Sequence, residues 1–128
     1  MEVCIKYSKD KFTKNKIEII KNFIGFLNRE FPLKRDVTII MKNESDDGMT
    51  TGSNKHGTIK VLSKGRMLID VLRTLAHEWV HEHQFQYNRK RANQDIGGPD
   101  EDEANAEAGK LLKIFAKDNP NKEDKMYE

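Results

Sequence analysis

The segment Leu75-Ala76-His77-Glu78-Trp79-Val80-His81 constrains the fold most, because it sets His-Glu-x-x-His within apolar residues at helical spacing. A helix over residues 67–87 places these apolar side chains on one broad face: Leu68, Val71, Leu72, Leu75, Ala76 and Trp79. His77 and His81 fall on the opposite side, since four residues make about one helical turn. The pattern predicts a helix that packs on the core and forms the floor of a cleft.

His-Glu-x-x-His on a helix is the arrangement that holds a zinc ion next to a catalytic base. The two imidazoles point the same way and can share one cation, while Glu78 lies beside them without being a ligand. The alternative is a chance match, with two solvated histidines on a charged surface helix. The thick apolar face and the opposite polar face, which also holds Asp70 and Thr74, favour the metal site.

A second helix is expected to open after Gly97-Gly98-Pro99 and to run to about Lys117. Proline near the first turn, acids within that turn and apolar residues at helical spacing all fit this prediction. Glu103 shares with Glu107 a face that is offset from the apolar one, so this helix can pack on the core and direct a carboxylate at the metal. The alternative is a capping box of Asp100 and Glu103, which stabilises a helix without any metal.

A carboxylate is the expected third ligand, because no histidine follows His83. An extended zinc motif would place a glycine and a third histidine after His81, where this chain has Gln84 and Tyr87. The predicted ligands of one zinc ion per chain are therefore His77, His81 and Glu103.

The pattern His77-Glu78-x-x-His81, followed by Glu103-Ala104-Asn105 and a short helix, resembles the gluzincin group of zinc metallopeptidases. It is similar above all to their smallest members, the ImmA/IrrE-like and related minigluzincin domains. Those domains pair this helix with a later glutamate in a Glu-Ala-Asn-x-Phe-Ala-like context, and at the aromatic position this chain has Glu107. The resemblance covers roughly residues 67–117 and implies a small zincin-like α+β domain with zinc-dependent peptidase activity.

Glu78 is expected to act as the general base in a hydrolysis by metal-activated water. Ligating imidazoles usually donate their second N–H to a carboxylate or carbonyl, and Glu107 and Asp70 are the candidates. The resemblance to larger gluzincins gives Glu107 the position four residues after the ligand, bonded to the first histidine. Two other classes stay open: a DNA-associated regulatory protein with switch-type proteolysis, and a non-catalytic metal-binding interaction module.

One domain over residues 1–117 is expected, because 128 residues can bury one modest core but not two. Residues 118–128, with Pro120 and mixed charges, are expected to fray. The first residues lack the apolar core of a signal peptide, no stretch approaches membrane-spanning length, and a single cysteine excludes an internal disulfide. These features predict a cytoplasmic protein without a membrane partner.

The remaining pattern predicts the element order β-α-β-β-α-α. Residues 3–7 alternate as a strand does, and a helix follows with Thr13 as its cap. Residues 37–41 and 58–62 are β-branched runs of strand length, and the polar residues between them predict a flap or a hairpin tip. Because residues 58–62 lead directly into the helix of the histidines, we expect an edge strand there that pairs with an extended peptide.

Charge is divided unevenly, with 13 basic and 8 acidic residues in residues 1–64 and 10 and 13 in residues 65–128. A basic half can face nucleic acid, but lysines spread along an amphipathic helix usually only solvate it. The expected partner is therefore a protein or peptide substrate, and nucleic-acid binding is not favoured. The sequence leaves the oligomeric state open.

Overall fold

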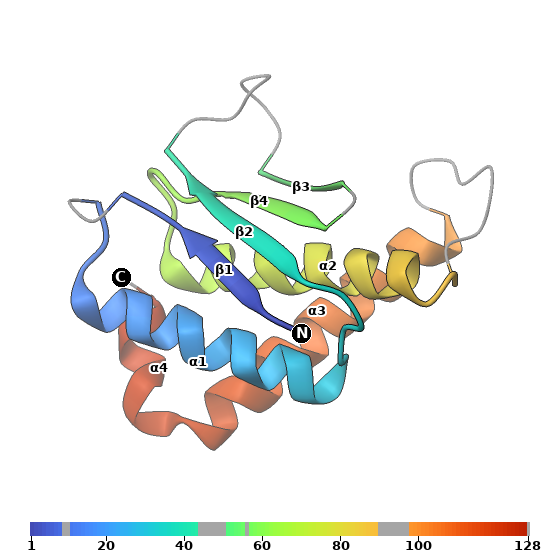
Figure 1. The fold of residues 1–128 in the computed structure, drawn as a ribbon. Helices are drawn as coiled ribbons and strands as arrows, with labels where there is room; N and C mark the ends of the chain where they lie inside the picture. Colours follow the sequence, from blue (N-terminus) through green and yellow to red (C-terminus); the bar gives the residue numbers. More distant parts are fainter. Residues whose placement is uncertain (9–10, 44–50, 56, 90–97, 128) are drawn as a thin grey trace.

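The structure is a computed structural model that describes residues 1–8, 11–43, 51–55, 57–89 and 98–127. These residues form a small α+β domain in which helices lie against one face of a four-stranded mixed sheet (Figure 1). The predicted α+β class is confirmed. None of the described helices is long and apolar enough to cross a membrane.

The sheet has the order β1-β2-β4-β3, and its strands in that order span Val3–Lys6, Val37–Lys42, Thr58–Leu62 and Gly52–Lys55. β2 runs parallel to both β1 and β4, and β3 is antiparallel to β4. Ile39 lies opposite Ile59, and Met41 lies opposite Val61, with all four side chains buried. Buried and partly exposed residues alternate along β2 and β4, as expected for a sheet packed on one face only.

The described helices are α1 at Lys14–Glu30, α2 at Leu68–Gln86, α3 at Pro99–Asp118 and α4 at Pro120–Met126. The predicted cap of α1 is confirmed, since the Thr13 hydroxyl accepts a hydrogen bond from the main-chain nitrogen of Lys16 at 3.2 Å. α2 is the helix predicted for the two histidines, and all six residues of its predicted apolar face are buried. It packs against α3 and against β3 and β4, so it is the element on which the site is built (Figure 1).

Two expectations about other segments are wrong. Residues 120–126, expected to fray, form α4, because the fully buried side chain of Met126 joins the core. β4, expected at the edge of the sheet, lies between β2 and β3. The edge strand is β3, whose residues Gly52-Ser53-Asn54-Lys55 carry no apolar side chain and are held by pairing with β4 in a hairpin. Residues 44–50 and 56 of the polar connection lie outside the described residues.

Candidate metal centre

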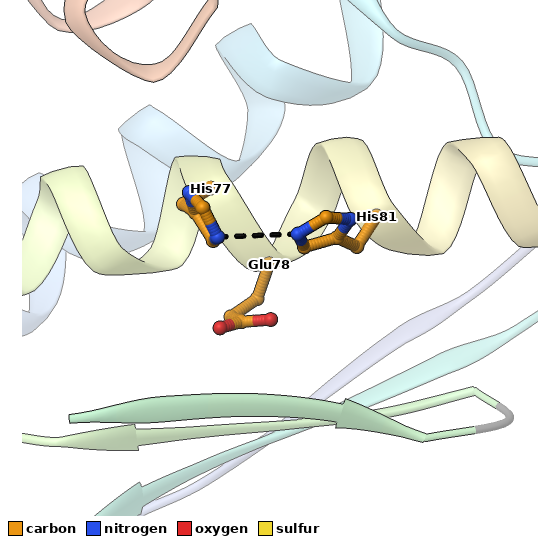
Figure 2. Close-up of side chains that lie close together, drawn as sticks. All are labelled: His77, Glu78 and His81. Atoms are coloured by element: carbon orange, nitrogen blue, oxygen red, sulfur yellow. Dashed lines mark hydrogen bonds between the residues drawn. The ribbon is translucent and has the colours of Figure 1, made fainter. Parts of the chain in front are cut away.

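α2 presents His77 and His81 one turn apart on the same side (Figure 2). Their Nε2 atoms lie 3.1 Å from each other. The donor atoms of His77, Glu78 and His81 all lie within 4.8 Å of one another, and the side chain of Glu78 extends from α2 toward the strands (Figure 2). The predicted grouping of these three residues is confirmed.

Glu101, in the first turn of α3, completes this group from a second helix. One of its carboxylate oxygens lies 2.8 Å from His77 Nε2, and the other lies 2.9 Å from His81 Nε2. For comparison, tetrahedral zinc bonded at about 2.0–2.1 Å separates its ligand atoms by about 3.3 Å. The observed distances are somewhat shorter and involve both oxygens of Glu101, so two imidazoles and a carboxylate match zinc in donor type and come near its ligand spacing.

The structure does not place Glu103 beside the histidines, so its predicted position is wrong. Its carboxylate accepts hydrogen bonds from Gln84 at 2.7 Å and from Arg89 at 3.1 and 3.2 Å. Glu101 precedes the buried Ala108 by seven residues and shares its side of α3, whereas two further residues turn Glu103 by about 200°. The predicted capping box of Asp100 and Glu103 is also wrong, because Gly98 is the N-cap residue and Asp100 lies within the first turn of α3.

The residue that supports His77 also differs from the prediction, by the same shift of two residues along α3. Among the described residues, Asn105 rather than Glu107 is hydrogen-bonded to the imidazole of His77. Asn105 lies four residues after Glu101, so the relation expected of Glu103 and Glu107 occurs two residues earlier in the chain. Burial lowers the pKa of His77 and outweighs the opposing charge of Glu101. A lower pKa favours the neutral imidazole, which is the form that binds a metal.

Asp70, the other residue predicted to support the histidines, interacts with Arg66 instead. The guanidinium of Arg66 donates to the main-chain oxygen of Asp70 at 3.1 Å and to the hydroxyl of Thr74 at 2.9 Å. These bonds tie the turn before α2 to its first two turns. Asp70 therefore interacts with Arg66 about two turns before His77 and does not support the histidines.

Gln84 is a partner of His81 that the sequence pattern did not reveal. Its side chain is fully buried, and its amide oxygen lies 2.8 Å from His81 Nδ1. The amide nitrogen donates to the main-chain oxygen of Asp100 at 3.0 Å as well as to Glu103. A glutamine three residues after the second histidine, on the same side of the helix, was the available signal.

The candidate metal centre opens into a cleft of about 510 Å³. Its lining comes from the start of β3, from α2 and from α3, and consists of Thr51, Gly52, Arg73, Thr74, His77, Glu78, Glu101, Asn105 and Ala108. Gly52 allows the edge strand to approach α2 closely, because a Cβ there would lie 2.4 Å from Thr74 Cγ2 and 3.1 Å from Glu78 Oε2. The cleft is thus narrow on the side of Glu78.

Comparisons with known proteins give no match. The chain matches no protein-family model, no curated protein and no solved structure.

Glu82, buried on α2, fixes the hairpin that carries the edge strand. Its carboxylate accepts hydrogen bonds from the Asn54 side chain at 2.7 Å, from the Gly57 main chain at 3.0 Å and from Gln86 at 2.7 Å. Gln86 also accepts from the main-chain nitrogens of residues 34 and 35 at 2.7 and 2.8 Å. Because buried polar groups are stable only when they are hydrogen-bonded, this network sets the position of β3 relative to Glu78.

The chain has two further histidines, His56 and His83. His83 packs edge-on against Phe31, stacks on Tyr87 and receives a hydrogen bond from Arg89 at 2.9 Å, so it is engaged away from the cleft. His56 lies outside the described residues. Among the described histidines, His77 and His81 are the two that meet Glu101.

Proposed function

We propose that the protein is a zinc-dependent metallopeptidase of the zincin type, in which His77, His81 and Glu101 hold one zinc ion. The main support is the convergence of two Nε2 atoms and a carboxylate at 2.8–3.1 Å from two different helices. Neutral imidazole nitrogens without a proton and carboxylate oxygens carry only lone pairs, so this spacing is stable when a cation or added protons lie between them. Zinc satisfies all three ligands at once.

Bound zinc would lower the pKa of a water molecule and polarise the carbonyl of the bond to be cleaved. Glu78 would accept the proton of the attacking water and deliver it to the leaving amine. Its position supports this role, because it follows a proposed ligand directly and lines the cleft while Glu101 occupies the ligand position. Glu78 as a whole has an exposed fraction of only 8%, so the residue is largely shielded from bulk solvent.

An extended peptide is the substrate that the cleft would accept. Within the described part of the sheet, β3 pairs with β4 on one side and forms the edge on the other. Thr51 and Gly52 at the start of this edge line the same cleft as His77 and Glu78. Main-chain hydrogen bonds to β3 would therefore lay a peptide across the proposed zinc ligands, the role that we expected of residues 58–62.

The experiment that tests this function compares the wild type with Glu78→Gln on an unbiased peptide library. We expect Glu78→Gln to keep its zinc and to lose cleavage, because the amide is nearly isosteric but cannot act as the base. Glu107→Gln is the matched control on α3 and should retain both properties. Zinc-loaded wild type that cleaves no peptide would favour a non-catalytic metal-binding module, and cleavage by Glu78→Gln would remove Glu78 from the mechanism.

A further inference from the structure

The amide of Gln84 can have only one orientation. Its nitrogen faces the main-chain oxygen of Asp100 at 3.0 Å and a carboxylate oxygen of Glu103 at 2.7 Å. Both atoms accept hydrogen bonds and neither donates, so an amide oxygen placed there would face two further lone-pair acceptors. The guanidinium of Arg89 donates to both oxygens of this carboxylate at 3.1 and 3.2 Å, so these oxygens act as acceptors.

This orientation determines the position of the proton on His81. The amide oxygen of Gln84 lies 2.8 Å from His81 Nδ1 and can only accept, so the neutral ring carries its proton on Nδ1. The lone pair is then on Nε2, the atom 2.9 Å from Glu101 and 3.1 Å from His77 Nε2. We propose that Gln84 is a positioning residue that holds His81 in the tautomer and orientation required for zinc binding. The inference rests on the proposed function and extends it.

Glu103 and Arg89 act through Gln84 in this arrangement. Asn88 has a left-handed backbone with φ of 54°, which turns the chain back at the end of α2. Arg89 then donates its main-chain N–H to the Gln84 main-chain oxygen at 2.7 Å, and its guanidinium donates to both carboxylate oxygens of Glu103. An exposed ion pair contributes little by itself, but here it holds the acceptor that orients a buried amide. Glu103 therefore supports a ligand instead of being one.

The test compares Gln84→Leu with Gln86→Leu. Both glutamines are buried on α2 and use both ends of the amide, but Gln86 bonds Glu82 and the main chain of residues 34 and 35. Zinc affinity is measured by competition with a chelator. The His81 tautomer is measured by nitrogen-15 NMR of the metal-free protein at about pH 8, where an ordinary imidazole is neutral.

We expect Gln84→Leu to weaken zinc binding by about 10–100-fold, the range for loss of a group that orients a metal ligand. We also expect a measurable fraction of the His81 proton to move to Nε2. Gln86→Leu should leave the Nδ1–H signal in place and change zinc affinity far less. Equal loss of affinity in the two variants, with the Nδ1–H signal intact in both, would overturn the proposal.

A second pair of variants keeps the test valid if Gln84→Leu does not fold. Gln84→Glu retains an acceptor for His81 but brings two carboxylates into contact, and adding Glu103→Gln restores a donor across the 2.7 Å contact. Zinc affinity should therefore fall in Gln84→Glu and recover in part in the double variant, where the Asp100 main-chain oxygen still faces a carboxylate oxygen. No recovery would count against the proposal. A wild type that takes up no zinc, together with a changed His81 tautomer in Gln84→Leu, would contradict the proposed function and support the positioning role.

Discussion

Replacing Gly52 with alanine tests how closely the edge strand is set against α2. The added carbon would lie 2.4 Å from Thr74 Cγ2, 3.1 Å from Glu78 Oε2 and 3.3 Å from Glu78 Cγ. Carbon atoms in contact prefer separations of about 3.5–4.0 Å, so the strand or the Thr74 side chain has to move by roughly 1 Å. Movement of the strand would also shift the wall of the cleft next to the proposed base.

The expected cost follows from two opposing effects. Overpacking costs about 1–3 kcal/mol, and the smaller conformational freedom of alanine in the unfolded chain returns about 0.4–1 kcal/mol. Because the shortest contact is severe, we expect a net loss of about 1–2 kcal/mol in the free energy of unfolding. At about 2.1 cal/mol/K of unfolding entropy per residue, 128 residues convert this loss into a Tm lower by about 4–7 °C.

Thermal unfolding followed by circular dichroism in metal-free buffer measures this loss. Thr74→Ser removes Cγ2 and retains the hydroxyl that accepts from Arg66, so Gly52→Ala should cost at least about 1 kcal/mol less in that background. Gly109→Ala is the control, because nothing lies within 4 Å of a Cβ there, and it should stabilise α3 by about 0.5–1 kcal/mol. An equal loss in both Thr74 backgrounds, or a gain like that of Gly109→Ala, would refute the close approach.

Two further predictions concern single side chains. Glu101→Gln should weaken zinc binding far more than Glu103→Gln, because Glu101 faces both histidines, whereas Glu103 acts through Gln84 and a glutamine there keeps an acceptor. Chelator competition measures both, and a larger loss in Glu103→Gln would contradict the assignment. Burial lowers the pKa of His83, so its contribution to stability is present above the unfolded pKa of about 6.5 and is lost as the pH falls through the folded value. Urea unfolding of the metal-free His83→Gln variant should therefore show a smaller fall in stability between about pH 7 and pH 5, and an unchanged fall would argue against this effect.

The helix of the two histidines could be predicted almost completely from the sequence. Its apolar residues recur at helical spacing, and each of them is buried. The same periodicity places His77 and His81 one turn apart, so the grouping of these residues with Glu78 required no tertiary information. Helix α1 with its cap and strands β1, β2 and β4 could also be predicted, because their buried or partly buried apolar residues follow simple periods.

Glu101, the proposed third ligand, could not be predicted from the sequence in this way. Residues 100–103 offer four successive carboxylates within one turn, and the packing of α3 decides which of them faces α2. Only the tertiary contact with α2 distinguishes Glu101 from Glu103, since both residues suit the N-terminal end of a helix. β3 was not predicted for a related reason. Its sequence has no alternation of apolar residues, and its position depends on pairing with β4 and on the carboxylate of Glu82.

The central claim is that His77, His81 and Glu101 bind one zinc ion. Elemental analysis of protein purified without added zinc or a histidine tag, followed by zinc titration, tests it most directly. We predict about one zinc per chain in the wild type and a large loss in His77→Ala, because each chain supplies three convergent ligands. Wild-type protein with no stoichiometric metal as purified and no uptake on titration would contradict the claim.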